Sequence, residues 1–354
     1  MLHALLISLP MVICLFWTVF FLIRLFQKQD EPRVTGLLVL FFLAATILYT
    51  DHWLYFSGVV NLVGEWSYGI VNLCVYPLYY AYLRALTRVP KSFEVPVLLI
   101  PALLAVCLFP IGRFGGHIAD QTMFFVIRIC FTLQVVWVLL RGWQLLMHTI
   151  RRMDDTYSDD RSRLLYPTRI SLLIFGITAV VSMTLNFFGR DFFAHDVSVS
   201  VPAIVMTILL YGLGFVAAHT VVPPETVAEE APVEALHPAD ESNTLIHKID
   251  ELMRVKFLYK NPQLTIHDLA RAVHSNRTYV SAAINKQYNV NFSTYVNHFR
   301  VEEAKRVLAD KKYEHDKEAI VDAISLSGFQ TDQTFYRVFK EMTGTTPLLF
   351  RQKH

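Results

Sequence analysis

Charged residues are scarce in this sequence. Asp, Glu, Lys and Arg make up 18% of its 354 residues, whereas 54% are hydrophobic and the mean hydropathy is +0.38. An average soluble domain carries about 25% charged and about 45–50% apolar residues. No short-period internal repeat is present, and the apolar residues are concentrated before about residue 220. This balance excludes an ordinary soluble protein.

Cysteine is also scarce, and the residue patterns of catalytic centres are missing. Cys14, Cys74, Cys107 and Cys130 lie in four separate apolar segments, where a thiol behaves as a small buried hydrophobe. The chain has no Cys-x-x-Cys or His-Glu-x-x-His motif and no glycine loop of the kind that cradles phosphate. None of the 13 histidines has ligand-like spacing. We therefore expect a protein that is not an enzyme and holds no cofactor or metal.

Seven apolar blocks before residue 220 each have about the length of a membrane span. A helix needs about 20 residues to cross about 30 Å of hydrocarbon. Six of the blocks have cores without charge, and the fifth carries only Arg128. The first is not a signal peptide, because no basic residue precedes it. The sequence thus predicts seven membrane helices, over residues 4–23, 34–50, 66–83, 95–112, 121–140, 170–189 and 197–218.

The basic residues between these blocks are distributed unevenly. The loop after the second block carries no Lys or Arg. The loop after the fourth block carries Arg113, and the loop after the sixth carries Arg190. Cytoplasmic loops are enriched in Lys and Arg, so this asymmetry predicts an N-terminus outside the cell and a C-terminal part in the cytoplasm. The loops after the odd-numbered blocks carry Arg24, Lys28, Arg33, Arg84, Arg88, Lys91, Arg151, Arg152, Arg161, Arg163 and Arg169.

Residues 222–243 differ from the segments on both sides. They contain six acidic residues and no Lys or Arg, and too few apolar residues to build a core. We interpret them as a flexible acidic linker. The predicted organisation is a membrane domain over residues 1–221, this linker, and a further domain over 244–354. That last domain has 17 Lys and Arg against 12 Asp and Glu, which favours a polyanionic partner without requiring one.

The last domain begins with two short helices separated by a tight turn at His274-Ser275. Thr265 is placed to cap the first helix, with Asp268 as the acid of a capping box, and Asn276 is placed to cap the second. Two such helices form a helix-turn-helix. The predicted inward residues are Ile266, Leu269, Ala270 and Val273, then Val280, Ala283 and Ile284; the outward face of the second helix is Thr278, Ser281, Ala282 and Asn285.

A second pair with the same design follows near the C-terminus. Gly328 supplies its turn and Thr331 caps the next helix. One such outward face is usually only a solvated surface, but two in tandem favour contact with DNA. Gln and Arg make bidentate contacts to base edges in the major groove, and Lys suits phosphate. The inward stripe of the second helix is Phe335, Val338, Phe339 and Met342, and its outward stripe is Gln333, Tyr336, Arg337 and Lys340.

A long helix is predicted between the two pairs, over residues 292–310. Its 19 residues would span about 28 Å, close to the roughly 34 Å between successive major-groove faces of B-DNA. We therefore expect this helix to space the two pairs along DNA. The residues on its apolar side are Phe292, Tyr295, Phe299, Ala304 and Leu308.

Residues 244–354 resemble the DNA-binding domain of AraC/XylS-type transcription regulators, in which one long helix joins two helix-turn-helix units. The resemblance implies a bacterial regulator, and the preceding spans make the layout similar to the family's membrane-embedded members. The expected location is then the bacterial inner membrane, crossed several times. The most specific matches are Gly328-Phe329, Phe335, Arg337, Phe339-Lys340, Gly344, Thr346-Pro347 and Phe350-Arg351, supported by Asp268-Leu269-Ala270, Arg300 and Ala304.

The sequence departs from the family at two positions of the first unit. His274 stands where a glycine is usual, and Ala282 stands where Arg or Lys is frequent, so base reading by this unit is expected to be weaker. The predicted DNA-binding residues are Arg277, Thr278, Ser281, Ala282, Asn285, Gln333, Thr334, Tyr336, Arg337 and Lys340.

Three ionisable residues stand out in the outer half of the predicted bundle. Asp51 and His52 lie near the end of the second block, and Arg128 lies in the fifth. Charges at such depth are costly and mark functional sites, so we predict that Asp51 and Arg128 pair, directly or through a ligand. The expected fold is all-α, and the expected partners are DNA, the bilayer, a small-molecule or membrane signal, and, as an open alternative, a second copy. The competing hypothesis is a receptor or transporter whose basic helical tail binds lipid headgroups or protein.

Overall fold

The computed structural model describes residues 2–28, 31–56, 65–88, 94–114, 117–159, 161–187, 196–220, 239–313 and 315–353. Within these ranges the chain is helical apart from short turns and has no β-strand beyond a single isolated bridge, which confirms the predicted all-α fold. It forms two compact units, which we describe separately. Unit 1 comprises Met1–Met147 and Leu164–Glu225, and unit 2 comprises His148–Arg163 and Thr226–His354.

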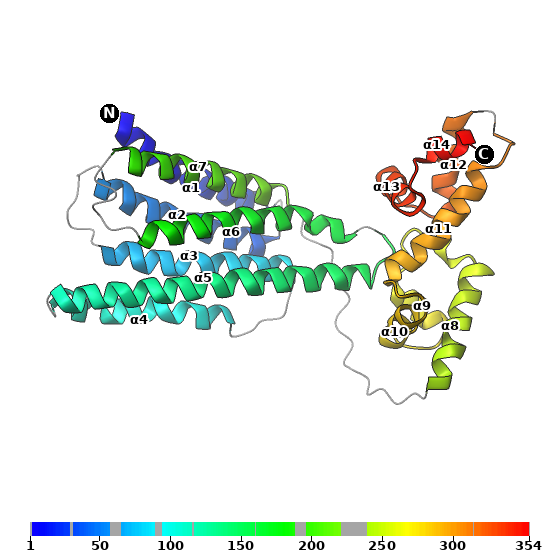
Figure 1. Cartoon of the computed structure of the whole chain (residues 1–354), viewed down its shortest axis with the longest axis horizontal. Helices are drawn as coiled ribbons and strands as arrows, with labels where there is room; N and C mark the ends of the chain where they lie inside the picture. The colour runs from blue at the N-terminus through cyan, green and yellow to red at the C-terminus, as the bar shows by residue number, and fades with distance from the viewer. Residues whose placement is uncertain are drawn as a thin grey trace. The chain divides into compact units, whose positions relative to one another are not determined.

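The described residues of unit 1 form seven helices at the places of the seven apolar blocks. Helix α1 packs against α2 and α7, and α3 packs against α2 and α4 (Figure 1). In the described part of the chain, α1, α2, α5, α6 and α7 are long and apolar enough to cross a membrane, and α4 contributes a shorter apolar stretch. The helix bounds are α1 Leu2–Gln27, α2 Pro32–Phe56, α3 Glu65–Leu86, α4 Glu94–Phe114, α5 His117–Asp154, α6 Tyr166–Phe187 and α7 Asp196–Ala218.

Close helix packing and aromatic rings form the interior of unit 1. The ring of Tyr79 in α3 stacks on that of Phe175 in α6, with centroids 3.7 Å apart. A Cβ added to Gly214 of α7 would lie 2.3 Å from a ring atom of Trp17 in α1. The small glycine thus lets these two helices approach closely.

Helix α5 is longer than the sequence predicts. The apolar block ends at Leu140, whereas the helix continues to Asp154 and has 38 residues, or about 57 Å. The continuation keeps an apolar face, on which Leu146 and Met153 are buried. The charge at Arg141 ends the apolar run but not the helix. The last seven residues of α5, from His148, belong to unit 2.

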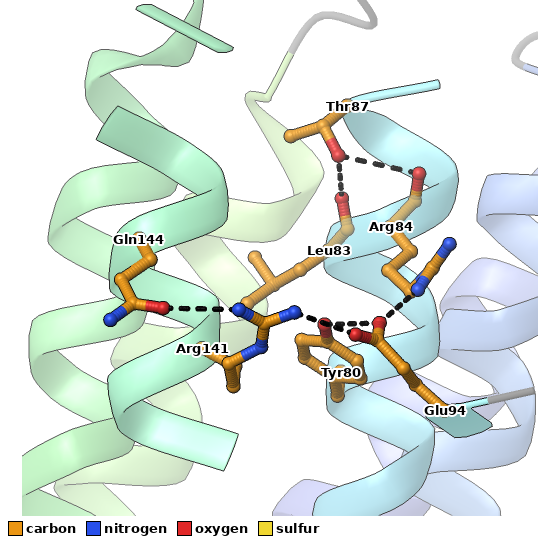
Figure 2. A network of polar contacts seen from close by, with 7 residues as sticks. All are labelled: Tyr80, Leu83, Arg84, Thr87, Glu94, Arg141 and Gln144. Atoms are coloured by element: carbon orange, nitrogen blue, oxygen red, sulfur yellow. Dashed lines mark hydrogen bonds and ion pairs between the residues drawn. The ribbon is translucent and has the colours of Figure 1, made fainter. Parts of the chain in front are cut away.

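Two of the basic residues predicted to face the cytoplasm, Arg24 and Arg84, make contacts at one end of unit 1. There the Glu94 carboxylate accepts hydrogen bonds from the hydroxyl of Tyr80 (2.9 Å) and from Nη2 of Arg141 (2.8 Å), and it is ion-paired with Arg84 (Figure 2). One carboxylate therefore joins α3, α4 and α5. At the same end Nη1 of Arg24 donates to the carbonyl of Ala218 (2.7 Å), which ties α1 to α7.

Unit 2 contains two hydrophobic cores joined by one long helix. The first core lies among α8, α9, α10 and the start of α11, and the second lies among the rest of α11, α12, α13 and α14. Of the predicted acidic linker, residues 222–238 lie outside the described residues, and α8 already begins at Ala239. The bounds are α8 Ala239–Arg254, α9 Ile266–Ala272, α10 Arg277–Tyr288, α11 Phe292–Leu308, α12 Asp316–Ser327, α13 Asp332–Thr343 and α14 Pro347–Lys353.

Helix α11 has 17 residues rather than the predicted 19, and therefore spans about 25 Å. The shortening has a local cause. The Asp310 carboxylate accepts a hydrogen bond from the backbone N–H of Lys312 (3.0 Å), which offers the chain a turn in place of a further helical bond.

Candidate nucleic-acid interface

Helices α9 and α10 form the first predicted helix pair, with the expected caps. The hydroxyl of Thr265 accepts from the N–H of Asp268 (3.2 Å), and the Asp268 carboxylate accepts from the N–H of Thr265 (3.0 Å), which confirms the capping box. The side chain of Asn276 accepts from the N–H of Tyr279 (2.9 Å) and caps α10. Burial raises the pKa of Asp268, but the hydrogen bonds from Thr265 and the nearby Arg271 outweigh it, so the pKa lies below its ordinary value.

The turn between these helices requires a left-handed residue, and His274 occupies that position with φ of 53°. For a residue with a Cβ this conformation costs about 1–2 kcal/mol. The position therefore suits the glycine that is usual in the family, and His274 is held there by the surrounding turn. Its N–H donates to the carbonyl of Arg271 (3.1 Å), and that of Ser275 donates to Ala270 (2.9 Å).

The outward face of α10 is open to solvent. Thr278, Ala282 and Asn285 are exposed, and Arg277 and Ser281 are half-buried, while the inward residues are buried as predicted. The face is short and nearly neutral. It offers small contacts to a groove: an amide, hydroxyls, the Ala282 methyl and one guanidinium at the start of the helix.

Helices α12 and α13 form the second pair, and its turn depends on Gly328. This residue has φ of 83°, and its N–H donates to the carbonyl of Ile324 at the end of α12. Thr331 accepts from the N–H of Thr334 (3.3 Å) and so caps α13. Phe335, Val338 and Phe339 are buried as predicted.

Met342 does not complete the inward stripe, so that prediction is wrong. Its side chain is 38% exposed. The reason lies in α14, whose Phe350 packs its ring 5.5 Å from that of Phe339 and fills the end of the core. A residue from a later helix thus occupies the place that the period of α13 alone assigned to Met342.

The outward face of α13 carries the larger and more polar side chains. Gln333, Tyr336 and Lys340 are exposed, and Thr334 is half-buried. Arg337 is half-buried and forms an ion pair with Glu341, one turn later in the helix. The predicted contact of Arg337 with a guanine edge would require its guanidinium to exchange this carboxylate for the base.

Arg300 of α11 is a residue of this unit whose contacts the sequence does not predict. Its guanidinium is buried, with 1% exposure, and donates to the carbonyls of Tyr259 (2.9 Å) and Asn261 (2.7 Å). It also donates to the carbonyl and to the hydroxyl of Ser158, each at 3.0 Å. Ser158 follows α5, far away in sequence, and no periodicity in that polar stretch points to such a contact.

The predicted sensor residues lie in unit 1 and are only partly buried. Asp51 and His52 are in the last turns of α2, and Arg128 is about 16 Å along α5 from its start at His117. No ion pair joins the carboxylate of Asp51 to the guanidinium of Arg128 among the described contacts. The pairing of Asp51 with Arg128, directly or through a ligand, stays a prediction.

Comparison with known proteins agrees with this geometry. Residues 269–353 match a family described as a helix-turn-helix domain, of the AraC type. The chain thus carries an AraC-type helix-turn-helix domain at its C-terminal end. No solved structure gives a significant match.

Curated proteins named as transcription regulators are similar to about a quarter of this chain. The uncharacterized HTH-type transcriptional regulator YtdP of Bacillus subtilis (strain 168) is 33% identical over 91 residues, which cover 26% of this chain and 11% of that protein. YobQ of the same organism, also an uncharacterized HTH-type transcriptional regulator, is 34% identical over 89 residues, 25% of this chain and 35% of its own. The matches thus span 11% and 35% of these two relatives and about a quarter of this chain.

Proposed function

We propose that this protein is a membrane-embedded, one-component transcription regulator, which senses a signal in its helical bundle and binds specific DNA sequences through unit 2. The observation that carries the proposal is the occurrence, in one chain, of two capped helix-turn-helix pairs on a common long helix and a separate bundle of apolar helices. The relatives named as transcription regulators support the DNA-binding half of the proposal.

The outer surface of unit 1 supports the membrane half. Large apolar side chains on its helices point outward, among them Leu133 of α5 at 65% exposure and Ile208 of α7 at 66%. Soluble proteins rarely leave contiguous apolar surface of this kind in water, whereas lipid tails cover it at no cost. The gathering of Arg24, Arg84 and Arg141 at one end of the bundle supports a cytoplasmic location for that end.

The DNA-binding half assigns different roles to the two outward faces. The α13 face, with Gln333 and Arg337, can read base edges, and Lys340 can contact phosphate. The α10 face can contribute mainly van der Waals and amide contacts, including a contact from Ala282 to a thymine methyl group. Helix α11, about 25 Å long, separates the two faces along the duplex.

The competing hypothesis is a receptor or transporter whose basic tail binds lipid headgroups or another protein. Such a tail has no need for the outward stripe of α13, and its affinity for DNA would show no sequence preference. The two functions are therefore separated by selectivity and not by DNA binding alone, because any basic domain binds DNA weakly at low salt.

The test uses the full chain in lipid nanodiscs. Sheared genomic DNA is passed over the immobilised protein, and the retained fragments are sequenced at increasing salt. We expect a small set of fragments to remain at salt that removes bulk DNA. The matched control is the double variant Gln333→Ala, Arg337→Ala, which should retain DNA without the same enrichment. Retention of no fragment above background, or the same fragments with both proteins, would contradict the proposal.

For the sensing half, we propose that the site includes Asp51, His52 and Arg128. A lone charge in the bilayer costs about 2.5 kcal/mol or more, so each is expected to hold a partner in at least one signalling state. Asp51→Asn or Arg128→Gln should alter reporter transcription at unchanged protein level, and a charge-swapped double variant recovers it only if the contact is direct. Wild-type signalling by both single variants would remove these residues from the sensor.

A further inference from the structure

Residues 155–158, which we call the docking segment, leave the end of α5 and join the fold of unit 2. The segment pairs with the start of α9 as a short antiparallel bridge between Tyr157 and Thr265. The N–H of Ser158 donates to the carbonyl of Leu264 (3.1 Å), and the N–H of Ile266 donates to that of Thr156 (2.9 Å). Ile266 is the first residue of α9, so the segment satisfies an N–H that the helix itself leaves without a partner.

The docking segment is packed as closely as the interior of the domain. Thr156, Tyr157 and Ser158 are all buried, and Met153 in the preceding turn of α5 is buried as well. The guanidinium of Arg161 lies 4.4 Å from the centroid of the Tyr157 ring and covers its outer side. Burial of these polar residues, together with the two backbone hydrogen bonds to Leu264 and Ile266, makes this a specific contact.

The place of docking is the junction of the two helix-turn-helix pairs. Arg300, which binds Ser158, lies midway along α11, with its guanidinium 5.9 Å from the centroid of Phe329, beside the second turn. The carbonyl of Tyr259, which also accepts from Arg300, would lie 2.5 Å from a Cβ on Gly328. The docking segment therefore binds Arg300, a residue of α11 that lies between the two helix pairs.

Charged residues near this segment also affect the helices that carry the outward faces, α10 and α13. Burial raises the pKa of Asp155, and the charge of Arg277 at the start of α10 lowers it by less. Arg163 lies with its Nη2 3.7 Å from the Glu341 carboxylate of α13, the same carboxylate that pairs with Arg337. Arg163, which follows the docking segment, thus contacts the carboxylate that holds the predicted DNA-binding residue Arg337.

We propose that the docking segment is the contact through which the membrane helices control the DNA-binding unit: when docked, it braces the two helix-turn-helix pairs in the arrangement that binds DNA, and when released it lets them loosen. This inference rests on the proposed function. It is supported by the continuity of α5, which belongs to unit 1 up to Met147 and to unit 2 from His148. A shift or rotation of α5 pulls directly on the segment.

Arg300 keeps hydrogen-bond partners when the segment is released. Its guanidinium donates to the carbonyls of Tyr259 and Asn261 and to two oxygens of Ser158. When the segment leaves, the carbonyls of Tyr259 and Asn261 remain, and water can replace the oxygens of Ser158. A buried charge that kept no partner would prevent such a step, because its desolvation would be uncompensated.

A disulfide tests the bracing directly. Tyr157 and Thr265 form the non-hydrogen-bonded type of antiparallel pair, whose Cα atoms lie about 4.5 Å apart, within the range that a disulfide spans. The test protein is the full chain in nanodiscs, with its four native cysteines replaced by alanine and with Tyr157→Cys and Thr265→Cys. Ser158→Leu is added to release the segment, because a buried serine has no room for leucine.

The readout is the affinity for the genomic fragment that the wild-type chain retains best. We expect Ser158→Leu to weaken binding roughly tenfold, within the usual range of coupling between sites, and oxidation to restore it. The reduced form of the same protein is the matched control. Hydrogen exchange at the Ile266 N–H should rise in the released form and fall on oxidation. Unchanged or tighter DNA binding by Ser158→Leu in a protein whose wild type binds DNA would overturn this inference alone. Failure of the wild type to retain any fragment would overturn the proposed function and this inference with it.

Discussion

Gly328 is the position where one methyl group should most disturb unit 2. It ends α12 with a left-handed φ of 83°. A Cβ there would lie 2.5 Å from the carbonyl oxygen of Tyr259 and 2.7 Å from Cα of Lys260, both backbone atoms. That carbonyl cannot simply move away, because it accepts the hydrogen bond from Nε of Arg300. Gly344, which ends α13 with φ of 73°, has nothing within 4 Å of the same position.

The two glycines therefore separate backbone strain from steric overlap. Gly344→Ala adds only the left-handed strain of about 1–2 kcal/mol, offset by about 0.4–1 kcal/mol because alanine restricts the unfolded chain. The expected net cost is about 1 kcal/mol. Gly328→Ala adds the same strain and an overlap worth about 1–3 kcal/mol, so its expected cost is about 2–4 kcal/mol.

Hydrogen exchange on the full chain in nanodiscs measures both costs. The slowest amides of α11 and α13 report the opening of unit 2, and each 1.4 kcal/mol accelerates their exchange about tenfold. We expect about a fivefold increase for Gly344→Ala and roughly 30-fold to 1,000-fold for Gly328→Ala. Equal acceleration by the two variants would show that Gly328 does not lie against Tyr259 and Lys260, and would refute the packing of the two helix pairs described here.

Three further predictions concern other parts of the chain. Arg337→Ala should cost about 1–3 kcal/mol of DNA-binding free energy and relax the preference at one base pair. Lys340→Ala should instead weaken binding to all sequences equally and lower by about one the slope of affinity against salt concentration. If both variants act identically on specific and random DNA, Arg337 does not read a base. Asp268→Asn should cost unit 2 about 1 kcal/mol at pH 7. The pKa of Asp268 in the folded protein is depressed, so this contribution to stability is present above the ordinary pKa of 3.8 and is lost as the pH falls below it. The urea midpoints of the variant and the wild type should therefore converge in acid. A gap between the midpoints that stays constant with pH would argue against the capping box. Gly214→Ala places a Cβ against the indole ring of Trp17 and should lower the stability of the bundle by about 1–3 kcal/mol. Gly36→Ala has open space around the added Cβ and should leave stability unchanged or slightly higher. Similar melting temperatures of the two variants would contradict the contact between α1 and α7.

Local patterns in the sequence were enough to predict most of the helix pairs. The capping box of Thr265 and Asp268, the cap at Asn276 and the turn at Gly328 depend on residues three or four positions apart, whose interactions a short helix fixes by itself. The prediction for Met342 was wrong because it depended on helical period alone. The period of α13 assigns Met342 to the inward face, but Phe350 of α14 fills the end of this core instead.

The same distinction applies to the bundle. Hydropathy located its helices, because the length of an apolar run is a local property. It ended the fifth helix at Leu140, although the helix continues to Asp154, because the charge of Arg141 ends the apolar run without breaking backbone hydrogen bonds. The partners of Glu94, drawn from α3 and α5, lie 10 to 47 residues away and could not be assigned from spacing.

The sequence by itself thus determined the all-α class, the apolar helices and the two capped helix pairs, because each depends on periodicity or on contacts within one or two turns. Only the tertiary structure decided that Ser158 meets Arg300, 142 residues apart, and that residues 148–163 belong with the DNA-binding unit. Such contacts satisfy backbone groups and a buried guanidinium that many other polar segments could satisfy equally well. No local rule selects among them, and the choice is made when the whole chain packs.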